Sequence, residues 1–264
     1  MKHFIKTIIT KLGDILGLSI HIQIKRDRKS DFVLVDKFVF SPFLNNEMES
    51  QLYKEAMHKS DATWSDNFYK QCRYYSLSQL AEVAAKRFPD ADIAECGVWK
   101  GHSAWMIAKI FSQNNFKGHF HIFDSFEGGL SDKVAKDKNL VRDMTDGEVK
   151  NEKEIFSSRE NQVAKVLSDF SFVKLYSGWI PVRFPEISDK EFSFVHIDVD
   201  LYEPTLSSLA FFWPRLANGG FIVVDDYGSS QFPGATTATD EFLAKNKASF
   251  FYKVPMGACF IVKP

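Results

Sequence analysis

Residues 194–205 read FVHIDVDLYEPT, and residues 221–230 read FIVVDDYGSS. In each stretch an apolar run leads directly into two aspartates, which are Asp198 and Asp200 in the first and Asp225 and Asp226 in the second. A short apolar run of this kind is typical of a buried strand. Carboxylates that converge without a counter-charge repel one another. The two stretches therefore predict strands whose acidic ends either point apart or share a positive group.

Strand and helix patterns alternate on both sides of these stretches. Strands are predicted over residues 93–97, 119–124 and 172–178, and helices over residues 76–88, 103–111, 160–170 and 203–216. Apolar strands that alternate with helices are typical of a parallel sheet covered on both faces. Near the C-terminus, two further strand patterns are separated only by Met-Gly, too short for a crossover helix, so they predict an antiparallel hairpin at the sheet edge. The fold class is α/β, a doubly wound and mostly parallel seven-stranded sheet.

Composition narrows the class of protein. The chain has 264 residues, 45% of them hydrophobic, with 33 basic and 34 acidic side chains, so it suits one α/β domain and gives no global charge that would favour nucleic acid. Cys72, Cys96 and Cys259 lack the spacing of a metal site, which favours the reducing cytoplasm. No stretch approaches the roughly 20 apolar residues of a transmembrane helix.

Residues 1–75 are expected to form an N-terminal helical extension, and residues 76–264 the main domain. Residues 4–20 show apolar residues at helical spacing, which predicts an amphipathic helix. Basic residues outnumber acidic ones over residues 1–30, so contact with a membrane surface stays open beside packing on the domain or on a second subunit. Lys6, Lys11 and Asp14 interrupt the segment, which disfavours a signal peptide.

The first strand of the alternation leads into the loop ECGVWKGHS at residues 95–103. Gly97 and Gly101 allow tight backbone passage, and the helix start that follows offers free N–H groups to an anion. Glu95 would repel a pyrophosphate but would suit an ammonium group. Asp124 ends the second strand, where a carboxylate can accept hydrogen bonds from ribose hydroxyls. Taken singly, Glu95 and Asp124 could equally cap a loop, and His102 stays open between a cofactor contact and solvent.

Five ordered motifs carry a family resemblance: ECGVWKGHS, FDSFEG, SGW, HIDVDLYEPT and GGFIVVDDY followed by PGA. Together they resemble the macrocin O-methyltransferase family, metal-dependent class I S-adenosylmethionine enzymes that methylate sugar hydroxyls of antibiotics. The resemblance covers about residues 91–245 and leaves the first 70 or so uncovered. It implies S-adenosylmethionine and Mg²⁺ as cofactors, a sugar or glycan hydroxyl as acceptor, and a homo-oligomer.

The resemblance also implies site residues. Those expected to bind the cofactor are Glu95 and Ser103 at its methionine end with Gly97 and Gly101 in the loop, Asp124 and Ser125 at the ribose, and Ser177 and Trp179 at the adenine. Those expected to hold the divalent ion are Asp198, Asp225 and Asp226, with Asp200 as general base and Asp198 and Asp200 as the catalytic pair. The chemistry agrees, because carboxylates supply the hard oxygen ligands of Mg²⁺, and a bound cation acidifies a hydroxyl.

Two alternatives remain at the level of sequence. Residues 198–200 read DVD, the D-x-D pattern of metal-dependent nucleotide-sugar glycosyltransferases. A scaffold that kept the fold without catalysis is the second alternative. The polar stretch over residues 129–158 lacks apolar periodicity and is predicted to be a mobile lid that orders over bound ligands. His196, inside an apolar strand, is expected to be a hydrogen-bonded core residue.

Overall fold

The computed structural model describes residues 33–35, 38–40, 42–43, 46–140, 142–255 and 257–264. The chain divides into two compact units, residues 1–40 and residues 41–264. In the first unit, β1 (Val33–Val35) and β2 (Phe38–Phe40) pair antiparallel. The helix predicted over residues 4–20, and with it the basic segment of residues 1–30, lies outside the described residues.

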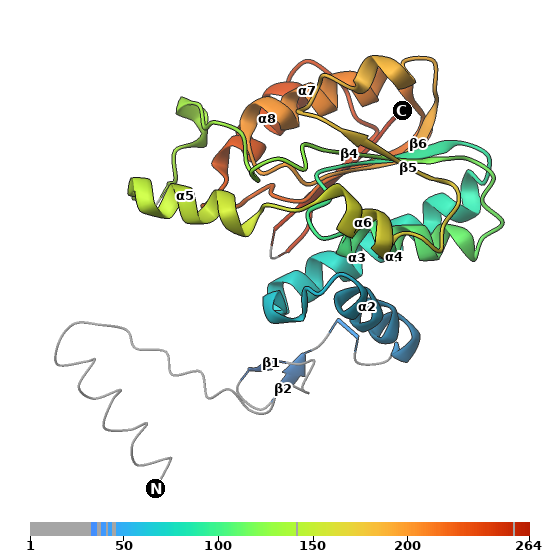
Figure 1. The fold of residues 1–264 in the computed structure, drawn as a ribbon. Coiled ribbons are helices and arrows are strands. Elements are labelled where there is room, and N and C mark those ends of the chain that lie inside the picture. Colours follow the sequence, from blue (N-terminus) through green and yellow to red (C-terminus); the bar gives the residue numbers. More distant parts are fainter. Residues whose placement is uncertain (1–32, 36–37, 41, 44–45, 141, 256) are drawn as a thin grey trace, which may run out of the picture. The chain divides into compact units, whose positions relative to one another are not determined.

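The second unit is built on a seven-stranded sheet with the strand order β5-β4-β3-β6-β7-β9-β8 (Figure 1). The parallel strands are β3 (Asp92–Cys96), β4 (Phe120–Asp124), β5 (Val173–Ser177), β6 (Phe192–Ile197) and β7 (Leu216–Val224). The chain ends in an antiparallel hairpin of β8 (Phe250–Lys253) and β9 (Cys259–Val262), with β8 at the sheet edge. The predicted doubly wound, mostly parallel sheet is confirmed.

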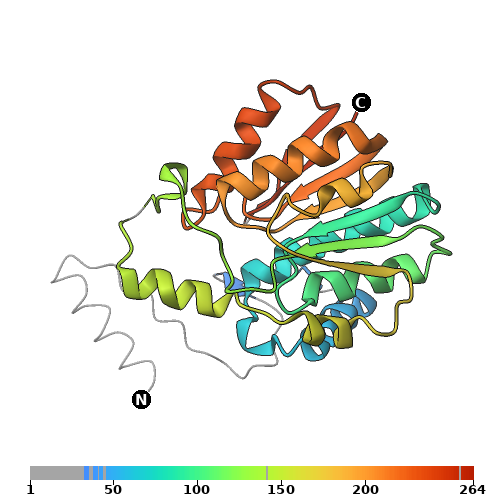
Figure 2. The same cartoon turned by 45° about the horizontal axis from the view of Figure 1, so that its top comes forward.

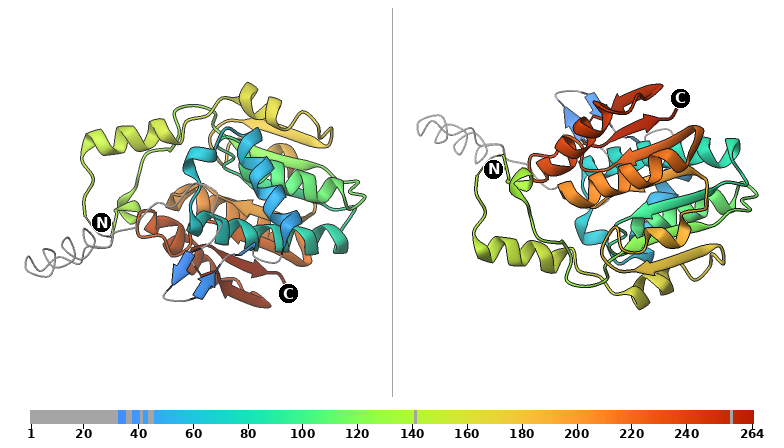
Figure 3. Two further views of the ribbon diagram at one scale, coloured as in Figure 1. Left: turned by 90° about the horizontal axis from the view of Figure 1, so that it is seen from below. Right: turned by 90° about the horizontal axis from the view of Figure 1, so that it is seen from above.

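Helices cover both faces of this sheet (Figures 1 and 3). Those on one face are α7 (Tyr202–Phe212) and α8 (Pro233–Leu243), and those on the other are α3 (Phe68–Arg87), α4 (His102–Ser112) and α6 (Glu160–Val166), with α2 (Glu47–Lys59) beyond them. Among the helices that the structure describes, none is both long and apolar enough to cross a membrane.

Helix α3 begins earlier than residue 76, where the sequence predicted its start. Asn67 caps it, because the Asn67 side chain accepts a hydrogen bond of 2.8 Å from the Lys70 amide. The apolar periodicity sets in only later in the helix, so its first two turns gave no helical signal. Since α3 runs through residue 76, we propose the boundary of the main domain near residue 41, in line with the division into compact units.

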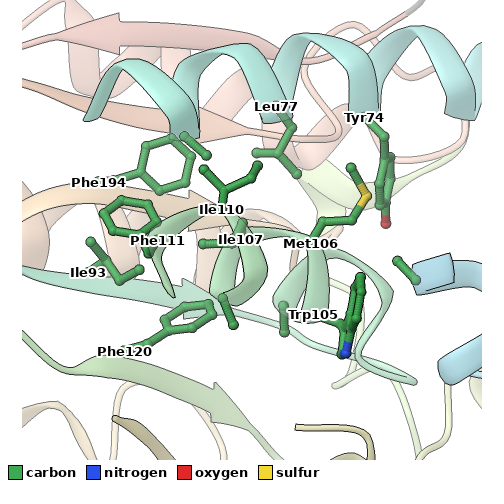
Figure 4. Close-up of a cluster of buried hydrophobic side chains, with 14 of the residues drawn as sticks. Tyr74, Leu77, Ile93, Trp105, Met106, Ile107, Ile110, Phe111, Phe120 and Phe194 are labelled. Atoms are coloured by element: carbon green, nitrogen blue, oxygen red, sulfur yellow. The ribbon is translucent and has the colours of Figure 1, made fainter. Parts of the chain in front are cut away.

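Successive core side chains along each strand point to opposite faces of the sheet, because side chains in a strand alternate with a period of two. Ile93 and Phe194 face α3 and α4, whereas Ala94 and Val195, their neighbours in the chain, face α7 and α8. Figure 4 shows the first of these two layers: side chains of α3, among them Leu77, point toward those of α4. The two layers hold the sheet rigid, and the strand ends are therefore fixed in position.

A polar cluster at the start of β3 ties three strands together. Asp92 accepts hydrogen bonds from the His119 amide at 2.7 Å and from His121 Nε2 at 3.0 Å. The other ring nitrogen of His121 pairs with the Tyr176 hydroxyl of β5 at 2.9 Å. Burial raises the pKa of Asp92, but the hydrogen bonds and charges of the two histidines outweigh burial and lower it.

Replacing Asp92 by alanine should lower the free energy of unfolding by about 1–3 kcal/mol at pH 7, because the buried His121 Nε2 and the His119 amide both lose their acceptor. Chemical denaturation measures this, and Asp90→Ala is the control, since Asp90 makes only an exposed ion pair with Lys117 and should cost less than about 1 kcal/mol. The lowered pKa means that the contribution of Asp92 is present above about pH 4 and fades as the pH falls. Equal effects of the two substitutions would contradict the prediction.

Candidate active site

The carboxyl ends of the parallel strands meet at one edge of the sheet, and the backbone ladder continues one residue past them. The Asp198 amide donates to the Cys96 carbonyl at 2.8 Å, and the Asp225 amide donates to the Ile197 carbonyl at 2.9 Å. Gly97 has a φ of +79° and lies so close to β6 that a Cβ there would fall 1.8 Å from the Asp198 carbonyl oxygen. Only glycine fits here, and its close approach fixes the glycine loop against the first aspartate.

Three of the four aspartates converge. One carboxylate oxygen from each of Asp198, Asp200 and Asp226 lies within 4.8 Å of the other two. Asp200 adopts a left-handed backbone conformation with a φ of 59°, which aspartate tolerates better than most residues. This turn brings Asp200 back beside Asp198, so both carboxylates reach the same small volume.

Repulsion and burial together make this cluster electrostatically unfavourable as it stands. Burial, followed by the charges of the neighbouring aspartates, raises the pKa of both Asp198 and Asp200 well above the ordinary value. Burial and the Asp225 charge raise the pKa of Asp226 to about 7. The Asp226 Oδ2 atom is buried and has no hydrogen-bond partner within the described part of the chain. A cation among these oxygens would relieve both the repulsion and the missing contact.

Asp225, the fourth aspartate, has a different environment. Its carboxylate forms an ion pair with Arg73 of α3, and His196 Nε2 lies 3.8 Å from its other oxygen. Burial opposes ionisation of Asp225, but the Arg73 charge lowers its pKa to about 2. The sequence placed Asp225 among the ion ligands; the structure instead turns it toward Arg73 and His196, and its role stays a prediction.

His196 continues this chain of charges toward the glycine loop. It is fully buried, and its Nδ1 atom lies 2.7 Å from Glu95 Oε1, in agreement with the expected hydrogen-bonded core histidine. Burial lowers the pKa of His196, yet the flanking Asp225 and Glu95 carboxylates raise it to about 10. The second oxygen of Glu95, Oε2, is buried and has no hydrogen-bond partner among the described residues. Glu95 therefore keeps one free acceptor beside the loop.

The sequence analysis missed the contribution of α3 to this site. Lys70 and Arg73 stand three residues apart, on one face of the helix, and both are half-buried next to the acidic cluster. Lys70 donates to Ser65 Oγ at 2.8 Å and lies 5.2 Å from the centre of the Trp99 ring. The signal in the sequence was two basic residues at helical spacing in KQCRYY, but the helix start itself was not recognised.

His102, which the sequence left open, is buried rather than exposed to solvent. Its ring stacks on Tyr74 with 4.3 Å between ring centres and meets Tyr53 edge-on at 5.0 Å. Burial lowers the pKa of His102 well below its ordinary value. We assign it to the packing of α4 against α3 and α2.

Asp124, at the end of β4, caps the glycine loop in this structure. Its carboxylate accepts hydrogen bonds from the backbone amides of Val98 at 2.9 Å, Trp99 at 3.2 Å and Phe126 at 2.9 Å. Burial raises the pKa of Asp124, against the effect of these hydrogen bonds. The carboxylate thus organises the loop, and binding of ribose hydroxyls remains a prediction for it.

The other residues expected at the cofactor lie along the ends of β3, β4 and β5. Gly101 is the N-cap of α4 with a φ of 87°, and Ser103 is buried in the first turn of that helix. Ser177 pairs in register with Asp124, and Ser125 Oγ accepts from the Glu127 amide at 3.2 Å. The Trp179 side chain, just past β5, is 40% exposed. Their roles at the cofactor stay predictions.

The segment of residues 129–158 contains α5 (Asp146–Ile155), which stands apart from the two helix layers (Figure 2). In the N-terminal part of the segment, the buried Asp137 carboxylate accepts a hydrogen bond of 2.7 Å from the Tyr202 amide, at the N-terminus of α7. Near the C-terminal end of the segment, the Ile155 carbonyl accepts a hydrogen bond of 2.8 Å from Trp99 Nε1 of the glycine loop. The segment is therefore anchored at both ends of the site; that it moves as a lid stays a prediction.

The sequence model described as macrocin-O-methyltransferase (TylF) matches residues 18–252. The chain belongs to this family. It is an O-methyltransferase of the S-adenosylmethionine-dependent class I type, as the sequence predicted, and the glycosyltransferase and scaffold alternatives fall away.

Curated relatives and solved structures agree with this assignment. Demethyldecarbamoylnovobiocin O-methyltransferase of Streptomyces niveus is 23% identical over 204 residues, 73% of this chain and 74% of that protein. Mycinamicin III 3''-O-methyltransferase of Micromonospora griseorubida is 22% identical over 218 residues, 80% of this chain and 84% of that protein. Among solved structures, the O-methyltransferase NovP has a TM-score of 0.57 at 21% identity, covering 73% of this chain and 79% of that one. Calicheamicin methyltransferase CalS11 has a TM-score of 0.52 at 15% identity, covering 92% and 99%. Both structures share the fold.

Replacing Arg73 of the methyltransferase by glutamine should lower the free energy of unfolding by about 3–5 kcal/mol in EDTA, because Asp225 is left buried without its counter-charge. Adding Asp225→Asn should restore much of that loss, so the two changes are not additive. Denaturation of the two single variants and the double variant measures the coupling. Lys86→Gln, on the exposed side of the same helix, is the control and should cost less than about 1 kcal/mol. Additive effects of Arg73→Gln and Asp225→Asn would show that the pair does not stabilise the fold.

Proposed function

We propose that this methyltransferase transfers a methyl group from S-adenosylmethionine to a sugar hydroxyl, with a divalent cation held at Asp198 and Asp226. The observation that carries this proposal is the cluster of the half-buried Asp198 with the buried Asp200 and Asp226, in which one carboxylate oxygen of each residue lies within 4.8 Å of the other two. Three carboxylates so close together and so shielded from water need a compensating charge. Their position at the strand ends beside the glycine loop is the position of a reaction centre in an α/β fold.

The donor set fits Mg²⁺. Carboxylate oxygens are the ligands that this ion prefers, and it commonly binds proteins through one or two carboxylates while it keeps water or substrate oxygens at its other positions. The unpartnered Asp226 Oδ2 atom and the raised pKa values of Asp198 and Asp226 both indicate a missing positive charge. When bound, the cation supplies the charge that lowers the pKa of an acceptor hydroxyl.

Two ligand sets are possible for the ion, and they differ in whether Asp225 is a ligand. The family resemblance implies Asp225 as a third ligand, whereas the structure places its carboxylate on Arg73 and near His196. If Asp225 were a ligand, its carboxylate would have to contact the cation and Arg73 together, or give up its ion pair with Arg73. As a partner of Arg73 only, Asp225 would act by holding α3 against the strand ends.

Asp200 is our candidate for the general base. It follows β6 on a left-handed turn and is 7% exposed. Its carboxylate lies next to those of Asp198 and Asp226. A base must lie within hydrogen-bond reach of the proton that it takes, and a hydroxyl bound next to Asp198 and Asp226 would lie beside Asp200. Asp200 would accept that proton as the oxygen attacks the methyl group.

The cofactor would lie over the glycine loop. S-adenosylmethionine supplies the methyl group and carries an ammonium, for which the free Glu95 Oε2 atom is a suitable acceptor. Asp124 would exchange part of its loop contacts for ribose hydroxyls, with Ser125 nearby, and Ser177 and Trp179 would border the adenine. The side chains of Glu95 and Asp124 thus bind and orient the cofactor, while the close approach of Gly97 to Asp198 keeps the glycine loop next to the ion site.

A sugar is proposed as the acceptor because of the relatives. One of them, named 8-demethyl-8-(2,3-dimethoxy-alpha-L-rhamnosyl)-tetracenomycin-C 4'-O-methyltransferase, from Streptomyces olivaceus, is 29% identical over 161 residues, 59% of this chain and 60% of that protein. We also keep the expectations of a homo-oligomer and of a cytoplasmic location, the latter supported by three unpaired cysteines.

Methyl transfer to a panel of glycosides should require a divalent cation and should stop in excess EDTA. Asp198→Asn and Asp226→Asn should each weaken Mg²⁺ or Mn²⁺ binding at least about tenfold, because each removes a charged ligand. Calorimetric titration measures this, with the exposed Asp189→Asn as control. In the same titration, Asp225→Asn separates the two versions of the site: a loss equal to that of Asp226→Asn makes Asp225 a ligand, and an unchanged affinity leaves it to Arg73. Full activity in EDTA would refute the cation.

Asp200→Asn should lower kcat by a factor of about 10² to 10⁴, the usual contribution of a general base. Cofactor affinity and metal affinity should stay unchanged, and added Mg²⁺ should not restore the rate. Steady-state kinetics at saturating cation, together with the metal titration, measures both. A variant that instead loses the metal would make Asp200 a third ligand, and the base would have to be sought elsewhere.

A further inference from the structure

Helix α5 turns a charged residue inward. Its sequence, DGEVKNEKEI, has no apolar face, and Glu152 is the only buried residue in this fully described helix. The Glu152 side chain is 5% exposed. A helix that merely packs on its own domain buries an apolar stripe. The inward face of α5 is therefore suited to polar partners.

Glu152 has two such partners from different parts of the chain. Its Oε2 atom accepts from Lys133 Nζ at 2.5 Å, and its Oε1 atom accepts from Gln231 Nε2 at 2.9 Å. Gln231 belongs to the loop after β7, five residues past Asp226. The loop that follows β7 therefore carries both Asp226 and one of the two partners of Glu152.

Apolar side chains border this polar group. Leu130, Leu201 and Phe232 form a small buried cluster with Phe156 packed against it, and Leu201 follows Asp200 directly. The rings of Phe156 and Phe232 meet edge-on at 5.9 Å, and Lys133 Nζ lies 5.5 Å from the Phe232 ring. A few directed polar groups within an apolar border are typical of a small-molecule site. A sugar ring matches both, because its C–H groups suit the aromatic rings and its hydroxyls suit Glu, Gln and Lys.

The anchors of the segment over residues 129–158 hold this group in place. Asp137 fixes one end to the start of α7, and Trp99 fixes the other end to the glycine loop. Lys136 adds contacts of 2.7 Å to Glu241 and 2.8 Å to the Tyr202 hydroxyl. Side chains on such a braced segment are positioned before a ligand binds, which lowers the entropy that binding costs.

We propose that Glu152, Lys133 and Gln231 form the subsite that selects the acceptor sugar, with the Glu152 carboxylate accepting a hydrogen bond from a ring hydroxyl other than the one that is methylated. This inference rests on the proposed function, a sugar acceptor. The subsite binds the sugar while Asp200 and the ion site act on the reacting hydroxyl. Glu152 is thus a specificity-determining residue, and the competing role for it is that of an anchor for α5.

The experiment measures binding of four probes, the methyl glycosides of α-L-rhamnose, α-L-fucose, α-D-mannose and α-D-glucose, to the full chain with Mg²⁺ and S-adenosylhomocysteine. Calorimetry or ligand-observed NMR gives each Kd for the wild type, Glu152→Gln and Glu154→Gln. Glu154 is exposed on the same helix and serves as the matched control. The best-binding glycoside is then compared with its monodeoxy derivatives. Glu152→Gln should raise the Kd of that glycoside at least tenfold, with the Kd of S-adenosylhomocysteine unchanged, whereas Glu154→Gln should behave as wild type.

The decisive result is the pattern across the monodeoxy derivatives. Removing one particular hydroxyl should weaken binding to the wild type about tenfold but should leave binding to Glu152→Gln unaffected, since the variant has already lost that contact. An anchor for α5 would instead weaken the binding of all derivatives equally, and that outcome overturns the subsite. A wild type that methylates a glycoside which Glu152→Gln binds equally well rejects the subsite alone. A wild type that neither binds nor methylates any of the four rejects the subsite and the proposed acceptor together.

Discussion

The site depends on the compensation of negative charge that the fold itself buries. Four aspartates and Glu95 lie at or near the ends of adjacent strands, where an unpaired buried carboxylate costs several kcal/mol. The chain neutralises part of this charge through Arg73 and His196, which lie against Asp225 and Glu95. Among the residues that the structure describes, Asp198, Asp200 and Asp226 have no equivalent partner. That imbalance favours the binding of a positively charged ligand, because its charge compensates the carboxylates that the protein leaves without a counter-charge.

The elements around this edge contribute differently to the site. The sheet fixes the acidic residues through backbone contacts such as the close approach of Gly97 to Asp198, so their spacing does not depend on side-chain packing. Helix α3, which precedes the strand-helix alternation, contributes the basic side chains of Lys70 and Arg73. The segment over residues 129–158 is held to the start of α7 through Asp137 and to the glycine loop through Trp99. Substitutions in α3 should therefore act on charge balance, and substitutions in α5 on acceptor choice.

Much of the fold could be predicted from local sequence patterns, because apolar runs and helical periodicity indicate which side chains are buried. The strands, the terminal hairpin and the family motifs all lie in segments whose pattern is set by the sheet. The start of α3 was missed, since its first turns carry Lys70, Arg73 and several aromatic residues without a clear apolar stripe. His102 was also undecided, because the stacking partner that buries it, Tyr74, is distant in the chain.

The sequence by itself determined the doubly wound sheet, the acidic strand ends and the family, because each depends on residues that are contiguous or regularly spaced. Only the tertiary structure decided which aspartates meet. Asp200 joins Asp198 through a left-handed turn, and Asp225 turns toward an arginine 152 residues away in the chain. The same holds for Glu152, which looks like one exposed acid among many in a polar helix. Its burial arises from Lys133 and Gln231, and contacts between distant segments leave no trace in a local pattern.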